Sequence, residues 1–503
     1  MQDKNVNMEA HTQTGQGRKT VRFLLGWDAI EVSVQDTHQT VLQYLRNTAR
    51  LCGTKEGCAE GDCGACSVMI GEWVDGVVSY RTLNSCILFL TGLDGKQVLT
   101  IEHVSVEGLH PVQAAMVEFH GSQCGFCTPG IVMSLVAHHL NQGGLERVDI
   151  DDSLAGNLCR CTGYGPIISA AKSAMGKSIN SELENCFSRA RQQLESWADE
   201  DSPLLIVTTD DTYFSPKTQA QLSRFLGVHP GSTIVAGATD VGLWITKHGR
   251  RLSSIVSLGA VRDFTGIVET DTHIEIGANV TYAQAEQVFS GLSTSLGGLV
   301  RRIGGRQIRN SGTVCGNIAN GSPVGDLPPV FMALGSLLTL NSSQGQRSLP
   351  IEEYFIAYGE QDRRSGEYVA SVKIQKPVGT FRCYKVSKRF DQDISSVLGA
   401  FQIEIHAGKV VSARIAFGGM AGIPQRARGC EVALTGAEWN ARTIDRAKSA
   451  LDRDFQPLTD ARATQAYRQL VARNLLERFY LEQQSPDLVT QLSDRSAIEL
   501  FHA

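Results

Sequence analysis

The stretch EGCAEGDCGAC at residues 56–66 decides the fold of the N-terminal part of the chain, because it sets three cysteines in a Gly-rich loop. The candidate ligands are Cys58, Cys63, Cys66 and Cys86. The first three are spaced C-x4-C-x2-C, which is the spacing of a plant-type [2Fe–2S] site. The glycines of the loop allow tight turns that can point backbone N–H groups at the sulfurs. A structural zinc site is the alternative, although zinc ligands usually come as two paired knuckles.

A second group of cysteines follows between residues 121 and 167. Its members are Cys124, Cys127, Cys159 and Cys161. The 2+2 spacing leaves zinc as an open alternative. Their position favours an anionic cluster, because Cys127 precedes a helix opened by Pro129 and Cys161 precedes one opened by Pro166. Helix N-termini offer free N–H groups and the positive end of the helix dipole.

Composition limits the class of protein. The chain has 503 residues, 42% of them hydrophobic, and a formal charge of -5, which excludes wholesale disorder and argues against nucleic-acid binding as the main function. Nine of the 13 cysteines lie between Cys52 and Cys161. No apolar run is long enough to span a membrane, and the polar start lacks a signal core. We therefore expect a cytoplasmic protein whose crowded cysteines bind metal rather than form disulfides, with Cys52 a small buried side chain outside both sets.

Pattern changes along the chain predict a multidomain α+β protein. Short β-rich segments and then proline-opened helices fill the first third, and α/β patterns follow after Phe214. The predicted elements include helices over 443–451 and 460–483. They also include the strands TVRFLL, AIEVSV, CSVMI, FRCYKVS and VVSARIAFGG. The predicted parts are a disordered tail (1–19), a β-grasp ferredoxin-like domain (20–103), a four-helix domain (104–176), a polar linker (177–215), a ligand-binding α/β domain (216–378) and an α+β C-terminal domain (379–490).

Two Gly-rich stretches of the third domain suit a phosphate or sugar ligand. IVAGATDV at 234–241 follows a predicted strand but is not a G-x-G-x-x-G fingerprint. Gly237 would allow close backbone approach to a pyrophosphate, and Thr239 could donate a hydrogen bond. RNSGTVCGNIANGSPVGDLPP at 309–329 adds polar side chains and the acid Asp326. Ordinary surface turns remain the alternative for both.

The motifs GSQCGFCTPG (121–130), GNLCRCTGYGPI (156–167) and EGCAEGDCGAC closely resemble the iron–sulfur half of the molybdenum hydroxylase family. The resemblance implies a [2Fe–2S] cluster at both cysteine sets. Gly165 departs from the arginine that the family often has there, which puts a local contact in doubt but no ligand.

The Gly-rich stretches resemble the FAD-binding segments of the same family, whose flavin domain has a vanillyl-alcohol-oxidase-like fold. Carried over position by position, the resemblance implies these FAD contacts: Ile234, Val235, Ala236, Gly237, Ala238, Thr239, Asp240, Val241, Thr313, Asn317, Asp326, Val369 and Lys385. Cys315 stands where the family commonly has glycine. KRFDQDIS at 388–395 resembles the loop that influences access of NAD or oxygen to the flavin; its charges could equally be an ordinary solvated run.

The overall resemblance is to the small subunit of the purine-oxidising bacterial members of the family. It implies that electrons from the oxidation of hypoxanthine and xanthine to urate pass through the helical-domain cluster, the ferredoxin-like cluster and FAD to NAD. Nothing in the chain resembles the molybdopterin domain, so we expect that cofactor on a large partner subunit, in a heterotetramer of two small and two large subunits. No nucleic-acid or membrane partner and no catalytic residue on this chain are expected.

Three alternatives stay open at this point. The chain could serve a family member with another substrate, such as an aldehyde or a different N-heterocycle. It could be an autonomous NADH-dependent iron–sulfur flavoprotein reductase. It could also be a zinc-stabilised scaffold without a redox role.

Overall fold

The chain forms two compact units in a computed structural model that describes residues 17–198 and 200–485. Unit 1 contains the residues up to Asp263 together with Gly304–Gly312, and unit 2 contains Phe264–Ile303 and the residues from Thr313 on. The domain predicted over 216–378 is therefore divided between the two units. Most of the predicted tail, 1–16, lies outside the described residues. In the described part, no helix combines the length and the apolar character needed to cross a bilayer.

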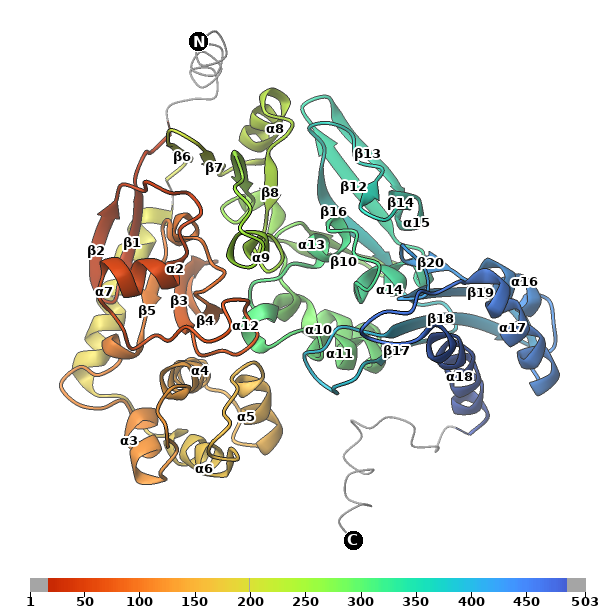
Figure 1. The fold of residues 1–503 in the computed structure, drawn as a ribbon, viewed down its shortest axis with the longest axis horizontal. Helices are drawn as coiled ribbons and strands as arrows, with labels where there is room; N and C mark the ends of the chain where they lie inside the picture. Colours follow the sequence, from red (N-terminus) through yellow and green to blue (C-terminus); the bar gives the residue numbers. More distant parts are fainter. Residues whose placement is uncertain (1–16, 199, 486–503) are drawn as a thin grey trace. The chain divides into compact units, whose positions relative to one another are not determined.

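Unit 1 begins with a five-stranded mixed sheet of β-grasp type (Figure 1). Its strands are Val21–Leu25 (β1), Asp28–Val32 (β2), Ser67–Val74 (β3), Val77–Asn84 (β4) and Gln97–Leu99 (β5). Their order is β2-β1-β5-β3-β4, with β1 parallel to β5 and the other pairs antiparallel. A short helix, Val41–Gln43 (α2), runs into a π-helical turn, Tyr44–Thr48, whose buried side chains pack on the sheet. The predicted strands TVRFLL, AIEVSV and CSVMI are confirmed as β1, β2 and the start of β3, and the Gly-rich loop lies between the π-helical turn and β3.

Four helices follow, as predicted for residues 104–176. They are Pro111–Glu118 (α3), Thr128–Leu140 (α4), Arg147–Leu154 (α5) and Gly165–Ala174 (α6). Proline stands in the first turn of α3, α4 and α6, where its missing N–H costs no intrahelical bond. The middle of α4 is buried from Gly130 to Ala137, so this helix is the core of the group.

The prediction of a linker over 177–215 is wrong for most of that segment. Residues Ser181–Ala198 form an 18-residue helix (α7) that buries Leu183, Cys186, Ala190 and Leu194. These side chains recur every three or four residues, and Ala190 and Leu194 pack on Leu24 of β1. The polar composition that suggested a linker belongs to the exposed face of this amphipathic helix.

The last part of unit 1 is a four-stranded sheet with the order β6-β7-β9-β8. Its strands are Leu204–Val207 (β6), Thr212–Ser215 (β7), Thr233–Val235 (β8) and Ser254–Ser257 (β9), with helices Gln219–Val228 (α8), Val241–Thr246 (α9) and Arg306–Arg309 (α12). β6 and β7 start within the predicted linker. The short helix α12 lies beside β4 and α5, although its sequence neighbours belong to unit 2 (Figure 1).

Unit 2 contains an antiparallel sheet with the order β10-β11-β16-β12-β13. Its strands are Ile267–Glu269 (β10), His273–Gly277 (β11), Leu337–Ser342 (β12), Gly345–Pro350 (β13) and Tyr368–Gln375 (β16). Its helices are Tyr282–Leu292 (α10), Thr294–Arg301 (α11), Val314–Ala319 (α13), Leu327–Ala333 (α14) and Ile351–Tyr354 (α15), and a small hairpin pairs Phe355–Ala357 (β14) with Glu360–Gln361 (β15). The helix α14 is buried along its whole length.

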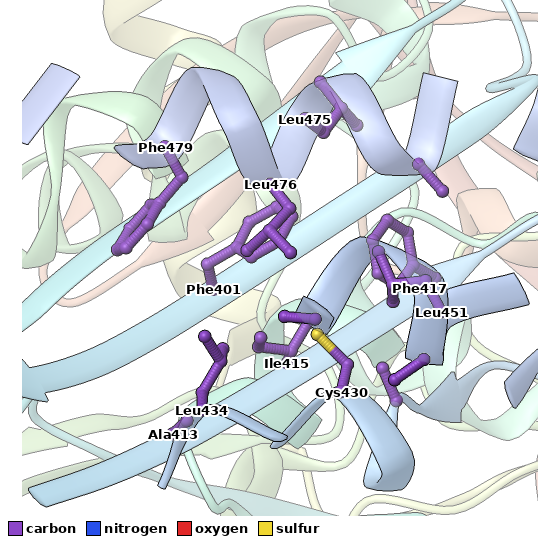
Figure 2. Close-up of a cluster of buried hydrophobic side chains, with 14 of the residues drawn as sticks. Phe401, Ala413, Ile415, Phe417, Cys430, Leu434, Leu451, Leu475, Leu476 and Phe479 are labelled. Carbon is purple, nitrogen blue, oxygen red and sulfur yellow. The ribbon is translucent and has the colours of Figure 1, made fainter. Parts of the chain in front are cut away.

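The C-terminal part of unit 2 is a second antiparallel sheet covered by three helices. The elements are Thr380–Val386 (β17), Val397–His406 (β18), Lys409–Gly418 (β19), Gln425–Arg426 (β20), Arg428–Leu434 (α16), Ala441–Asp454 (α17) and Gln465–Gln484 (α18). Figure 2 shows their shared core, in which Phe479 of α18 stacks on Phe401 of β18 at a ring distance of 5.5 Å. The predicted strands and helices of this region are confirmed.

Candidate functional site

The first cysteine set is assembled by the loop before β3 and the turn after β4. The sulfur of Cys58 contacts the thiols of Cys63 and Cys86, and the thiol of Cys66 contacts that of Cys86. Cys66 and Cys86 are buried, whereas Cys58 and Cys63 are half-buried. The structure therefore brings all four predicted residues to one site.

The loop around Cys58 is arranged to stabilise a thiolate. The backbone N–H groups of Glu60, Asp62 and Cys63 donate to its sulfur at 3.4, 3.3 and 3.4 Å. Donation by the thiols of Cys63 and Cys86 and by these N–H groups lowers the pKa of Cys58 strongly. Gly61 and Gly64 adopt φ values of +79° and +70°, which favour glycine. The predicted tight turns and N–H···S contacts are present.

The second cysteine set lies at the surface of the helical domain. The thiols pair as Cys124 with Cys161 and Cys127 with Cys159. Cys124 and Cys161 are exposed, and the other two are half-buried. Cys127 is the N-cap residue of α4, as expected, while Cys161 precedes the start of α6 by four residues. This set offers two of its ligands directly to the surface.

The pairing of the thiols distinguishes between the metal alternatives. Four thiolates around one zinc at about 2.3 Å would put every pair of sulfurs roughly 3.8 Å apart. Among the described residues, the one group of three or more candidate ligand atoms within 4.8 Å of one another contains no cysteine. In the second set the thiols are in contact as two separate pairs, which suits a dinuclear cluster in which each metal takes two of the four ligands. The donor set of the helical domain therefore fits [2Fe–2S] better than zinc.

The one group of candidate ligand atoms that lie within 4.8 Å of one another in the described residues consists of Asp36, His38 and Asp211. The Nε2 atom of His38 accepts the N–H of Leu252 at 2.9 Å, so its Nδ1 atom carries the proton. That Nδ1 lies 3.2 Å from Asp36 and 3.3 Å from Asp211, and Arg251 bridges both carboxylates. These ion pairs and hydrogen bonds hold two parts of unit 1 together. Both ring nitrogens of His38 are engaged, so the histidine has no free lone pair to bind a metal.

The two cysteine loops touch each other within unit 1. The N–H of Leu158, which precedes Cys159, donates to the carbonyl oxygen of Cys63 at 3.0 Å. A Cβ added to Gly130 would lie 2.2 Å from the carbonyl oxygen of Gly64, so glycine is required for this close packing. The neighbouring Asn157 side chain donates to the same Gly64 oxygen at 3.1 Å. Sequence reasoning missed Asn157, although it stands inside the quoted motif GNLCRC.

The predicted FAD stretch 234–241 lies in unit 1, where Ile234 and Val235 end β8 and Val241 starts α9. Between them, residues 236–240 form a turn in which Ala238 has a left-handed φ of 59°. A Cβ on Gly237 would lie 1.8 Å from the Ser311 carbonyl oxygen, so the glycine is needed for this chain crossing. The glycine therefore has a packing reason of its own, and the predicted approach of a pyrophosphate stays a prediction.

A small cavity lies between this stretch and the turn that follows β4. Its lining residues include Gly237, Thr239, Asn84 and Ile87, and the last two flank Cys86 closely in sequence. The volume of about 10 Å³ has room for a group of the size of one water molecule. The predicted flavin stretch and the residues on either side of Cys86 thus line one small cavity.

The other predicted FAD contacts lie in unit 2, and three of them are close together. Lys385 of β17 donates from Nζ to Oδ2 of Asp326 at 2.5 Å, and both side chains are buried. The Ser395 hydroxyl donates to the other oxygen of Asp326, also at 2.5 Å. Asn317 of α13 accepts the N–H of Leu327, the residue after Asp326, at 3.2 Å. Ser395 was missed as a candidate, although it ends the quoted segment KRFDQDIS.

The remaining unit 2 candidates have structural contacts of their own. Thr313 caps α13 by accepting the N–H of Gly316 at 3.0 Å, and Val369 is a buried residue of β16. Cys315 is buried with its thiol 3.6 Å from the Ile276 carbonyl oxygen, and burial raises its pKa to about 12. This cysteine therefore fills core space.

The loop that contains 388–395 is held by Arg302. Its guanidinium donates to the carbonyl oxygens of Phe390 and Lys385 at 2.8 and 3.1 Å and lies 4.5 Å from the centre of the Phe390 ring. Phe390 itself is largely exposed. Arg302 is the C-cap residue of α11, and its contacts fix the loop. The loop is therefore more than a run of solvated charged side chains.

The cysteines outside the two sets divide by burial. Cys186, Cys315, Cys383 and Cys430 are buried, in keeping with small apolar side chains. Cys52 is exposed, so the prediction that it is buried is wrong. It lies in the irregular turn after the π-helical segment, where its thiol donates to the Arg46 carbonyl oxygen at 3.9 Å.

Four family models match the chain in the predicted order. They are described as 2Fe-2S iron-sulfur cluster binding domain (27–91), [2Fe-2S] binding domain (100–172), FAD binding domain in molybdopterin dehydrogenase (208–377) and CO dehydrogenase flavoprotein C-terminal domain (382–483). The chain thus carries two [2Fe–2S]-binding domains, an FAD-binding domain and a flavoprotein C-terminal domain.

Whole-chain comparisons point the same way. The xanthine dehydrogenase of Emericella nidulans is 31% identical over 95% of this chain, and the xanthine dehydrogenase/oxidase of Gallus gallus is 29% identical over 97%. The chain spans only 39% and 42% of the length of these relatives. Among solved structures, reconstituted CO dehydrogenase from Oligotropha carboxidovorans has 25% identity and a TM-score of 0.50, covering 54% of this chain and 96% of that one. Quinoline 2-oxidoreductase from Pseudomonas putida 86, at 22% identity, 54% and 95% coverage and a TM-score of 0.50, shares the fold.

Proposed function

Because the chain belongs to the molybdenum hydroxylase family, as its iron–sulfur and FAD part, we propose that it is the electron-transfer subunit of a xanthine dehydrogenase. In this role it receives electrons from a molybdopterin-binding partner subunit and delivers them to NAD. The observation that carries the proposal is the pair of cysteine sets of unequal exposure, joined by the bond from Leu158 to Cys63. A surface set next to a more buried set suits a relay that starts at a partner protein.

We assign the eight paired cysteines as the cluster ligands. They are Cys58, Cys63, Cys66 and Cys86 in the ferredoxin-like domain and Cys124, Cys127, Cys159 and Cys161 in the helical domain. When bound, the clusters and FAD supply one-electron relay and conversion between single electrons and a hydride. The residues contribute thiolates, N–H donors to sulfur and the close packing that holds the two loops together.

We assign the flavin contacts to both predicted groups. In unit 1 they are Ile234, Val235, Ala236, Gly237, Ala238, Thr239, Asp240 and Val241, and in unit 2 they are Thr313, Asn317, Asp326, Val369 and Lys385. The cavity shared by Thr239 and the neighbours of Cys86 supports an electron path from the buried cysteine set toward the flavin stretch. The buried Asp326–Lys385 pair supplies charged, hydrogen-bonding groups in unit 2.

We infer the order of transfer from the exposure of the two sets. Cys124 and Cys161 are exposed, and Phe126 and Leu158 beside them are exposed apolar side chains, so this face suits docking of the molybdenum-bearing partner. Cys66 and Cys86 are buried, which suits the inner end of the relay. Oxidation of hypoxanthine or xanthine to urate on the partner would feed two electrons, one at a time, through this order to NAD. We further propose a heterotetramer of two small and two large subunits, in the cytoplasm, where thiols stay reduced.

A second molybdenum hydroxylase activity is the competing proposal. It is favoured by the solved structures of similar fold, whose printed names include CO dehydrogenase and quinoline 2-oxidoreductase. The chain itself does not hold the substrate pocket in either proposal, so the two differ only in the partner. Substrate oxidation by the native complex separates them.

The test is to purify the native complex and measure iron, flavin, molybdenum and NAD reduction together. We expect about four irons and one flavin per chain, and NADH formation with xanthine. Cys58→Ser should abolish NAD reduction by xanthine, while NADH oxidation by an artificial acceptor at the flavin survives. Turnover of quinoline or an aldehyde without xanthine turnover would support the competing proposal. A colourless zinc protein would contradict both.

A further inference from the structure

The segment Gly304–Gly312 is the one part of the chain beyond Asp263 that belongs to unit 1. It contains α12 and contacts three regions of that unit. The N–H of Arg306 donates to the Ala155 oxygen at 2.6 Å, the Asn310 side chain donates to the Thr82 oxygen at 3.1 Å, and the Ser311 hydroxyl donates to the Gly237 oxygen at 2.6 Å. The segment therefore links the helical domain, the ferredoxin-like sheet and the predicted flavin stretch.

The side chain at the centre of this segment is Gln307, which is only 1% exposed. Its Nε2 atom lies 2.7 Å from Oδ1 of Asn157, 3.1 Å from the Ser67 hydroxyl and 3.4 Å from the Ser134 hydroxyl. These partners come from the loop of the second cysteine set, from β3 and from α4. A buried amide with partners on three elements fixes their mutual positions.

The contact with Asn157 decides which way that amide points. Its Oδ1 accepts from Gln307 and also from the Ser134 hydroxyl at 2.7 Å. With the oxygen so engaged, the Nδ2 group must face the other way, where it donates to the Gly64 oxygen at 3.1 Å. Gln307 thereby holds Asn157 in the orientation that ties it to the first cysteine loop.

This tie lies directly beside the hydrogen bond from Leu158 to Cys63, which also joins the two cysteine loops. Gly64 follows Cys63 in sequence, and Asn157 precedes Leu158. The two bonds therefore join one pair of neighbouring residues, Asn157 and Leu158, to another pair, Cys63 and Gly64. Loss of the first bond would leave the Leu158–Cys63 bond and the close backbone packing of Gly64 against Gly156 to set the spacing of the two loops.

We propose that Gln307 is a positioning residue for electron transfer between the two cysteine sets, acting through Asn157. The inference rests on the proposed function, because it needs clusters at both sets. In the step concerned, one electron leaves the Cys124/Cys127/Cys159/Cys161 site and one enters the Cys58/Cys63/Cys66/Cys86 site, and no bond to a cysteine forms or breaks. Gln307 donates no ligand; it keeps the Leu158–Cys63 contact closed.

The experiment compares two variants in the purified native complex. Gln307→Leu keeps the size of the side chain but removes its hydrogen bonds. Gln307→Glu keeps a polar side chain but loses the donor to Asn157. The matched control is Gln192→Leu on the exposed face of α7. Low-temperature EPR of the fully reduced protein reports the magnetic coupling between the two clusters. Flash photoreduction with an external donor reports the rate at which an electron redistributes between them.

We expect the iron content of both variants to match the control, with altered magnetic coupling. The redistribution rate should fall roughly fivefold to tenfold, the factor by which one net buried hydrogen bond shifts an equilibrium between two arrangements. Asn157→Ala should give the same fall, and the double variant should fall no further, because the two residues act through one bond. Such non-additivity shows that the two residues act through one bond, and the retained iron content separates positioning from general loss of stability.

Coupling and rate equal to the control in a variant that holds both clusters would overturn the inference. Loss of the clusters from both Gln307 variants would also overturn it, because Gln307 would then serve folding. Neither result affects the proposed function. Absence of two reducible clusters in the wild-type complex would instead refute the proposed function itself.

Discussion

The buried ion pair between Lys385 and Asp326 gives a prediction whose size follows from the structure. The Nζ–Oδ2 distance is 2.5 Å, and the side chains are 2% and 8% exposed. Lys385→Met keeps most of the side-chain volume but removes the cation from the buried carboxylate. Breaking a buried pair from one side costs about 3–5 kcal/mol, because the remaining charge is left without its partner.

For a unit of about 200 residues, that loss lowers the melting temperature by roughly 6–20 °C. The assay is calorimetry of the protein stripped of FAD, in which the transitions of the two units are compared in one scan, since a single unfolding free energy is not defined for a multidomain chain. FAD is removed because bound ligand would add its own stabilisation. With FAD supplied, Lys385→Met should also retain less flavin per chain, as expected for a proposed flavin contact.

The matched control is Lys376→Met in the same unit. Lys376 pairs with Glu269 at 2.8 Å, but the side chains are 32% and 53% exposed, so the same substitution should cost about 0–1 kcal/mol. The double variant Lys385→Met with Asp326→Asn removes both charges and should recover much of the loss. Equal melting temperatures for Lys385→Met and Lys376→Met would refute the reasoning that burial makes the Lys385 pair important.

Three further predictions concern unit 1. Cys127→Ser should lower the iron content from about four to about two per chain, whereas Cys52→Ser, at the exposed cysteine outside both sets, should leave it unchanged. Gly130→Ala places a Cβ 2.2 Å from the Gly64 carbonyl oxygen, so we expect the free energy of unfolding to fall by about 1–3 kcal/mol. The visible spectrum should bleach on mild heating. Retention of colour equal to that of the wild type would count against the packing argument. Burial, together with nearby His139, lowers the pKa of His110 to about 3. Below about pH 6.5 the unfolded chain therefore binds a proton at this histidine that the folded chain does not bind. The stability that is present above about pH 6.5 is lost as the pH falls toward about 3. His110→Asn, which can still cap α3, should flatten the fall in melting temperature between pH 7 and 5.5, and an unchanged slope would contradict the assignment.

Local sequence predicted much of this protein. The spacing of Cys58, Cys63 and Cys66 is set by one loop, and proline in the first turn marks the starts of α3, α4 and α6, so short-range chemistry was sufficient. The strands and helices of the C-terminal domain were also predicted, because their apolar periodicity is strong. Periodicity was weaker evidence for α7, where a polar exposed face hid four buried positions.

The sequence by itself predicted the candidate ligand types and their grouping into two sets and determined the order of the domains, because these are encoded within a few neighbouring residues. Only the tertiary structure decided how the sets are exposed and joined. Gln307 meets Asn157 across 150 residues and Ser67 across 240, and Lys385 meets Asp326 across 59. No local pattern signals such pairs, since their partners are chosen by the packing of separate elements into one unit. The same packing explains why Gly237 is glycine: the Ser311 backbone crosses it.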